Sequence, residues 1–178
     1  MIPRTWSFTT LAVAVLSATP LTAAHAASAA DSVTTIFLVR HAEKDTVVVG
    51  ADPPLSAKGI LRAQELARVL GDVPLSAIYV TPYQRNRQTA QPLATHLGDT
   101  LTVITSIDST VAALRTKHYA QSVLAVGHSN TVPQIIEQLS GQKIAPFTEG
   151  DWDRLYVITL MPRRPASVVL LRYGARSR

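Results

Sequence analysis

Short apolar runs alternate with longer amphipathic stretches along most of this chain. The runs are continuous and rich in β-branched residues, which is typical of strands buried on both faces of a sheet. They lie at residues 33–39, 75–80, 101–105 and 122–127. Apolar positions at helical spacing follow each of them, over residues 56–70, 84–97, about 108–119 and 129–139. This alternation predicts right-handed crossovers and a largely parallel sheet with helices on both faces.

The first amphipathic stretch has clear signals at both ends. Ser56 is a suitable N-cap, and Gly71 follows the last periodic position. Within it, the side chains that we expect to face the sheet are Ile60, Ala63, Leu66, Ala67 and Leu70.

The pattern changes near the end of the chain. Two strand-like runs, 155–160 and 167–173, follow each other with only a short polar connection and no helix. They predict an antiparallel pair at one edge of the sheet. We therefore expect one domain over residues 33–178, with a three-layer α/β/α fold around a mostly parallel, doubly wound sheet.

The first 26 residues have the layout of a secretory signal peptide. Arg4 precedes an apolar core, and small residues surround Ala26. Cleavage after Ala26 or after Ala29 fits this pattern, and the core is shorter than the ~18 to 20 residues that span a bilayer. We expect an exported protein, periplasmic or secreted, without a stable membrane anchor after cleavage. Residues 27–32 then form a short segment before the domain.

Composition limits the partners. The 178 residues are 47% hydrophobic and 16% charged, with a formal net charge of +5 and no cysteine. This composition is typical of a globular protein, and without cysteine it has no disulfides even in an oxidising compartment. A modest positive charge suits anionic substrates, but the few aromatic residues are not interleaved with basic ones as a nucleic-acid surface requires. No pattern indicates an oligomeric state.

Four polar residues follow three of the predicted strands. Arg40 and His41 end the first, Arg85 lies shortly after the second, and His128 follows the fourth. Ligands of such sheets bind at the carboxyl ends of the strands, so these side chains should converge.

Two arginines beside two imidazoles favour an anion, because like charges at short range oppose each other. Guanidinium groups offer paired donors to phosphate oxygens, and a neutral imidazole can attack phosphorus to form a covalent phosphohistidine. We expect a small phosphorylated substrate. No metal or cofactor is predicted, since zinc-binding and glycine-rich phosphate-loop motifs are absent.

The stretches LVRHAEK, PLSAKG, TPYQRNRQTAQ and VGHSNT occur in this order. Together they resemble the histidine phosphatase superfamily, the phosphoglycerate mutase-like clan, in its small single-domain branch. The resemblance implies that His41 is the nucleophile and that Arg40, Arg85 and His128 complete the phosphate pocket. It also implies structural roles for the stretch at 55–59 and for Thr89 and Ala90.

Two departures favour a phosphatase over a mutase. Ala42 replaces the usual glycine after the nucleophile, and Val47 stands where the mutase pattern has asparagine. The domain is also too short for the lobe that mutases place over their substrate. We expect a metal-independent phosphomonoesterase. The alternatives are a phosphate-binding or sensing module with weak or lost catalysis, and a phosphomutase.

The general acid is the most open assignment. Relatives supply it after the third strand, which indicates Asp108, although this residue also suits a helix N-cap. Its rivals are Glu43, Glu149, Asp151 and Asp153. Further candidates for contacts with the substrate are Glu43, Lys44 and Asn130. The substrate itself is not indicated by these motifs.

Overall fold

The computed structural model describes residues 32–48 and 50–177. Its elements, in chain order, are β1 (Thr34–Arg40), α1 (Ala57–Leu70), β2 (Leu75–Val80), α2 (Gln84–Leu97), β3 (Leu101–Val103), α3 (Ile107–Thr116), β4 (Ser122–Gly127), α4 (Thr131–Ser140), β5 (Arg154–Leu160) and β6 (Ser167–Arg172). The predicted signal peptide at 1–26 lies outside the described residues.

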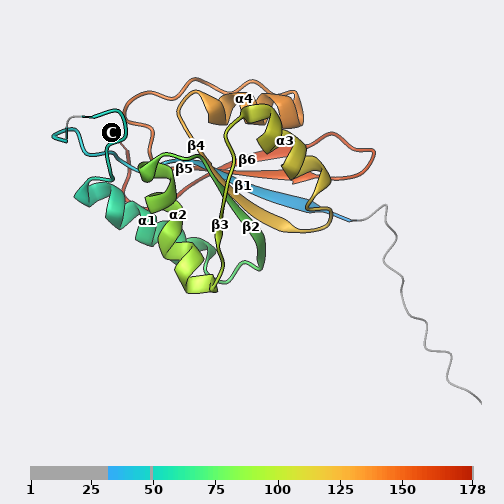
Figure 1. The fold of residues 1–178 in the computed structure, drawn as a ribbon. Helices are drawn as coiled ribbons and strands as arrows, with labels where there is room; N and C mark the ends of the chain where they lie inside the picture. Colours follow the sequence, from blue (N-terminus) through green and yellow to red (C-terminus); the bar gives the residue numbers. More distant parts are fainter. Residues whose placement is uncertain (1–31, 49, 178) are drawn as a thin grey trace, which may run out of the picture.

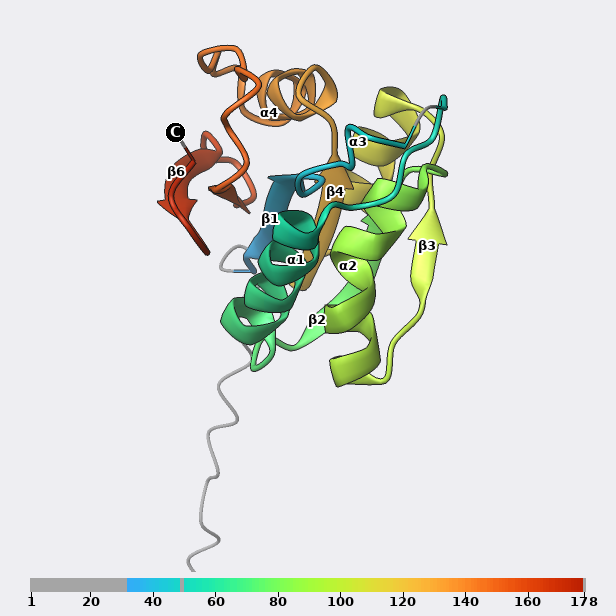
Figure 2. The ribbon, with the colours of Figure 1, turned by 90° about the vertical axis from the view of Figure 1, so that its left-hand side faces the viewer.

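All six strands form one sheet in the order β3-β2-β4-β1-β5-β6. The first four strands pair in parallel, while β5 runs antiparallel to both β1 and β6. Figure 2 shows β3 and β6 at the two opposite edges. The predicted α/β fold and its antiparallel C-terminal pair are confirmed.

The helices cover both faces of the sheet, as predicted. Figure 1 shows α1 and α2 on one side and α3 and α4 on the other. Alternate residues of β1 serve the two cores: Ile36 and Leu38 pack with α3 and α4, whereas Val39 packs with α1 and α2. This alternation follows from the two-residue period of a strand.

Several local expectations differ from the structure. Ile60 is 50% exposed, so only the later apolar positions of α1 face the sheet. Helix α3 begins at Ile107, because the Ser106 hydroxyl, rather than Asp108, caps it by accepting from the Ser109 amide at 3.1 Å. Helix α4 begins at Thr131, two residues later than expected.

Strands β1 and β4 are neighbours whose connections leave toward opposite faces. The β1 connection leads to α1 and the β4 connection to α4, while Arg40 and Gly127 stand in register at the carboxyl ends. Such a switch point leaves a crevice in which ligands of doubly wound sheets bind.

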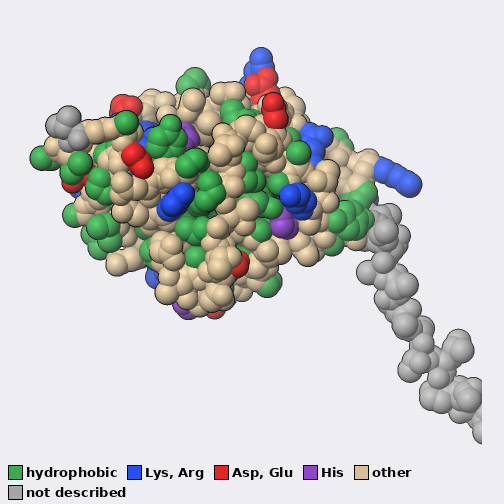
Figure 3. Space-filling model, viewed as in Figure 1, with side chains coloured by type: hydrophobic (Ala, Val, Ile, Leu, Met, Phe, Trp, Pro, Cys, Tyr) green, Lys and Arg blue, Asp and Glu red, His purple; other side chains and the backbone are tan. Residues whose placement is uncertain are grey.

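Charges are scattered over the face shown in Figure 3, where basic and acidic side chains lie among polar and hydrophobic ones. No helix among the described residues is both long and apolar enough to cross a membrane.

Gly59, in the first turn of α1, contacts the segment that follows β1. A Cβ at this position would lie 2.2 Å from the carbonyl oxygen of Glu43. The same carbonyl accepts hydrogen bonds from the backbone amide and hydroxyl of Ser56. Only glycine therefore permits this approach, which fixes the backbone two residues beyond His41.

We predict that Gly59→Ala destabilises the protein by about 1–3 kcal/mol, the usual cost of overpacking a rigid site. Alanine's better helix propensity would offset about 0.5–1 kcal/mol of this. Urea unfolding measures the change. Gly50→Ala, where nothing lies within 4 Å of the added Cβ, is the control. Equal stability of the two variants would show that the contact is unimportant.

Candidate active site

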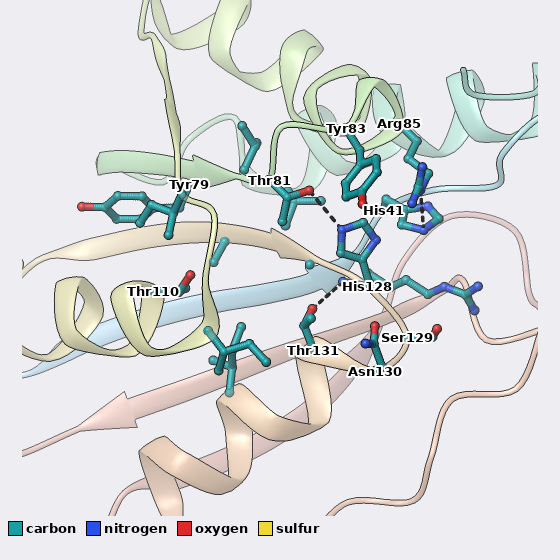
Figure 4. Close-up of a pocket in the computed structure, with 18 of the residues that line it drawn as sticks. His41, Tyr79, Thr81, Tyr83, Arg85, Thr110, His128, Ser129, Asn130 and Thr131 are labelled. Carbon is teal, nitrogen blue, oxygen red and sulfur yellow. Dashed lines mark hydrogen bonds between the residues drawn. The ribbon is translucent and has the colours of Figure 1, made fainter. Parts of the chain in front are cut away.

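A pocket of about 740 Å³ opens at the carboxyl ends of β1, β2 and β4. Arg40, His41, Arg85 and His128 all line it, although they come from distant parts of the sequence. Figure 4 shows His128 near the centre, with His41 and Arg85 on one side. The structure thus brings together the four residues that the sequence analysis grouped.

His41 is buried, and its ring orientation is fixed by two contacts. Nδ1 lies 2.8 Å from the carbonyl oxygen of Ala42, and Nε2 lies 3.3 Å from Nε of Arg85. A carbonyl can only accept, so Nδ1 carries the proton. Nε2 is then the unprotonated nitrogen, and it accepts from Arg85 at the pocket. This is the tautomer that a nucleophile requires.

The backbone around His41 is tied to the neighbouring elements. The His41 amide donates to the Gly127 carbonyl at 2.9 Å, and the Ala42 amide donates to the Thr89 hydroxyl at 2.9 Å. Thr89 in turn donates to the Arg85 carbonyl at 2.7 Å. Thr89, expected only to pack α2, therefore links the His41 turn to the helix that carries Arg85.

Arg85 is positioned by Asp52 and Tyr83. Nη1 of Arg85 lies 3.4 Å from Oδ1 of Asp52, and its guanidinium carbon lies 4.3 Å from the centroid of the Tyr83 ring. The Asp52 carboxylate also accepts from the Gln84 amide at 2.9 Å. Asp52 thus caps α2, whose own N-cap residue makes no side-chain cap.

Arg40 is 4% exposed and is positioned from the segment before β5. Its guanidinium carbon lies 3.6 Å from the centroid of the Trp152 ring, a cation–π contact. Nη1 donates to the Thr148 carbonyl at 2.9 Å, and Nη2 lies 3.8 Å from Oε2 of Glu149. Burial lowers the pKa of Arg40, although an arginine remains charged at neutral pH.

His128 faces His41 across the pocket, with 5.2 Å between the ring centroids. Its Nε2 lies 3.0 Å from the Thr81 hydroxyl, and its amide donates to the Thr131 hydroxyl at 2.8 Å. The Tyr83 ring packs edge-on against it at 5.2 Å. Thr81 and Tyr83 thus restrict the orientation of the imidazole, while Thr131 holds the backbone; Figure 4 draws the hydrogen bonds to Thr81 and Thr131.

Both imidazoles are held in the neutral form. Burial, with smaller contributions from His128, Arg40 and Arg85, lowers the pKa of His41 to about 3, although the hydrogen bond to Ala42 opposes this shift. Burial, with Arg85 and Arg40, lowers the pKa of His128 to about 4. Among these four residues, the two guanidinium groups are therefore the cations at neutral pH.

Among the candidate general acids, Glu149 is the one that lines the pocket. Its side chain is 89% exposed, beside Arg40. Asp108 is exposed on α3, and its Oδ1 accepts from Gln138 at 3.4 Å outside the pocket lining. Asp151 pairs with Arg154 at 2.8 Å.

The last rival acid is buried. Asp153 is 1% exposed and bonds to Arg172 at 2.7 Å.

The other predicted contacts lie in different places. Lys44 and Asn130 line the pocket and are exposed. Glu43 does not line it, because Arg62 binds the Glu43 carboxylate through Nε and Nη2 at 2.9 and 2.8 Å. The structure therefore places Glu43 with α1 rather than with a substrate.

The sequence pattern did not indicate four of the residues that support the site, namely Asp52, Trp152, Thr81 and Asn86. Asn86 is fully buried, and its Nδ2 donates to the carbonyls of Val126 and Gly127 at 3.0 and 3.1 Å. A polar residue on the buried side of a helix next to Arg85 is a signal that could have identified it. Asp52 and Trp152 lie in irregular segments, where spacing indicates no partner.

No three His, Asp or Glu side chains gather into a metal-binding group within residues 32–48 and 50–177.

Residues 36–108 match the model of the histidine phosphatase superfamily (branch 1). No curated protein matches the sequence.

Solved structures with the same fold include the protein histidine phosphatase SixA complexed with tungstate. It shares 19% identity at a TM-score of 0.65, over 78% of this chain and 96% of that one. The α-ribazole phosphatase from Shigella flexneri shares 18% at a TM-score of 0.62, over 81% and 98%. A phosphoglycerate mutase from Bacillus anthracis shares 17% at 0.59, over 80% and 94%.

We predict that acidification destabilises the fold through the buried histidines. Above pH ~6.5 both are neutral in the folded and unfolded states. Below it the unfolded chain binds protons first, so each histidine costs about 1.4 kcal/mol per pH unit until the folded-state pKa is reached. Urea unfolding between pH 7 and pH 4.5 measures this loss.

His41→Gln should reduce the acid-dependent loss relative to the unmodified protein, because it removes one of these sites. The exposed His96 supplies the matched control, and His96→Gln should keep the full loss. The same pH dependence in both variants would contradict the prediction.

Proposed function

We propose that this chain, whose residues 36–108 match the histidine phosphatase superfamily model, is an exported phosphomonoesterase that acts through a covalent phosphohistidine on His41. The observation that carries the proposal is the His41 tautomer. The Nδ1 contact with the Ala42 carbonyl leaves the Nε2 lone pair at the pocket, where Arg85 contacts it. Export rests on the signal-like pattern of residues 1–26.

The first step is attack on phosphorus by Nε2 of His41. The N–P bond forms as the bond from phosphorus to the ester oxygen breaks, and that oxygen takes up a proton. Arg40 and Arg85 are placed to bind the non-bridging oxygens, whose negative charge they offset in the transition state. His128 can contribute a further hydrogen bond, since Thr81 restricts its ring and Thr131 holds its backbone amide.

The second step is hydrolysis of the phosphohistidine. A water oxygen attacks phosphorus, the N–P bond breaks, and inorganic phosphate leaves while Nε2 recovers its lone pair. The proton that the water loses passes to solvent or to a neutral imidazole such as His128. Neither step calls for a metal, because the two guanidinium groups supply the positive charge.

Glu149 is our choice of proton donor in the first step, in place of Asp108. It is the candidate acid that lines the pocket, and its carboxylate lies 3.8 Å from Nη2 of Arg40. A phosphate bound at Arg40 would therefore lie beside this carboxyl group.

We predict that His41→Ala lowers hydrolysis of p-nitrophenyl phosphate by at least about 10³-fold, because the nucleophile is lost. The exposed His96→Ala serves as the control and should keep full activity. Rapid acid-free quenching during turnover should trap an acid-labile phosphate on the protein, absent from His41→Ala. Unchanged turnover in this variant would refute the mechanism.

Phosphate-binding and phosphosugar assays on the same protein separate the alternatives. Phosphate binding without turnover would indicate a phosphate-binding module, and isomer formation from a phosphosugar without free phosphate would indicate a mutase.

We predict that Glu149→Gln lowers kcat for alkyl phosphates by about 10²-fold, the usual contribution of a positioned acid. p-Nitrophenyl phosphate should be affected much less, since nitrophenolate leaves without protonation. Asp108→Asn is the matched control and should change neither rate. A loss confined to Asp108→Asn would restore the assignment from the sequence.

A further inference from the structure

The pocket is much larger than a phosphate group requires. Its volume of about 740 Å³ is within the range of sites for whole small molecules, about 300–1,000 Å³. Figure 4 shows Tyr79 and Thr110 on the opposite side of His128 from His41 and Arg85. The pocket therefore has a second part, beneath α3.

We call this part the inner arm and define it by Tyr79, Ile104, Ile107, Thr110, Ala125 and Ile135, all of which line the pocket. Tyr79 and Ala125 stand in register on β2 and β4. Both belong to the core between the sheet and α3 and α4, and Ala125 has only a methyl side chain. Both also line the pocket, which therefore extends to this part of the sheet.

Charge is confined to the other end of the pocket. Apart from the two histidines, the ionisable Lys, Arg, Asp and Glu residues that line the pocket are Arg40, Lys44, Arg85 and Glu149. Two of them are within or just beyond β1, and the other two contact Arg40 or His41. A charged group in the inner arm would lose its hydration without gaining a counter-ion, at a large cost in free energy.

The hydroxyl groups of the inner arm are already bonded within the protein. The Tyr79 hydroxyl lies 2.6 Å from Nε2 of the buried His118, and the Thr110 hydroxyl donates to the Ser106 carbonyl at 2.8 Å. The arm is therefore lined mainly by three isoleucine side chains and the Tyr79 ring, of which Ile135 and Tyr79 are largely buried. Such a surface binds apolar groups and gains little from a sugar.

We propose that the substrate is a phosphate monoester of an uncharged, mainly apolar alcohol or phenol, whose organic group occupies the inner arm. The assignment rests on the proposed function, because it takes the phosphate to bind at Arg40, His41 and Arg85. Hydrolysis would release that alcohol and inorganic phosphate.

Binding of phosphonates, which do not hydrolyse, tests the arm independently of catalysis. Calorimetry compares methylphosphonate, benzylphosphonate and 2-naphthylmethylphosphonate, with 3-phosphonopropionate as the charged probe. Affinity should rise about tenfold or more from the methyl to the naphthylmethyl compound, as apolar area is buried. The charged probe should bind more weakly than benzylphosphonate.

Filling the arm should remove this gain. Thr110→Phe should lower naphthylmethyl affinity about tenfold while methylphosphonate binds as before. The matched control is Thr116→Phe, since Thr116 is on the same helix, is exposed and donates its hydroxyl to a carbonyl in the same way. If Thr110→Phe does not fold, Thr105→Trp at the rim of the pocket replaces it.

Equal affinity of the unmodified protein for all three phosphonates would overturn the proposal, as would tighter binding of the charged probe. Identical losses in Thr110→Phe and Thr116→Phe would do the same. Turnover of phenyl phosphate is measured in parallel. Its absence, with the phosphonate series intact, would refute the proposed function and leave the inner arm as a binding site.

Discussion

The contact between Nδ1 of His41 and the carbonyl of Ala42 is the interaction on which the site depends. It assigns the ring proton to Nδ1, so Nε2 remains an acceptor and Arg85 can approach it. With the proton on Nε2 instead, two donors would face each other and the lone pair would point at a carbonyl oxygen. The His41 amide donates a hydrogen bond to the Gly127 carbonyl, and the Ala42 amide donates one to the Thr89 hydroxyl. These two hydrogen bonds keep the Ala42 carbonyl in position. The chemistry therefore depends on backbone geometry at the end of β1.

A second constraint is the proximity of two guanidinium groups. The structure gives each of them an aromatic ring and a carboxylate of its own: Trp152 and Glu149 for Arg40, Tyr83 and Asp52 for Arg85. Aromatic faces and carboxylates both attract cations, which lowers the repulsion between the two arginines. Neutral imidazoles add no further positive charge. Two cations can thus remain side by side and ready for an anion.

Most of the fold could be predicted from sequence, because strand and helix periods are local signals. The convergence of Arg40, His41, Arg85 and His128 followed from a general rule about parallel sheets, so it needed no detailed geometry. The partners of these residues were not predictable in this way. Asp52 and Trp152 lie in irregular segments, and their positions depend on how the chain folds back over the sheet.

The same limit explains why the sequence did not indicate where the carboxylates of Asp108 and Glu43 lie. Position after a strand indicated Asp108, but α3 begins at Ile107 and directs that side chain away from the pocket. Glu43 is close to the nucleophile in sequence, but Arg62 of α1 binds it, which spacing alone did not reveal.

The position of Asp52 limits how the loop that carries it can change in length. From this loop, Asp52 caps α2 at Gln84, 32 residues later in the chain, and contacts Arg85, 33 residues later. Surface loops usually accept insertions and deletions freely, whereas a change of length between β1 and Asp52 would displace an arginine of the phosphate site. Descendants of this sequence should therefore vary in the residues of that loop more readily than in its length.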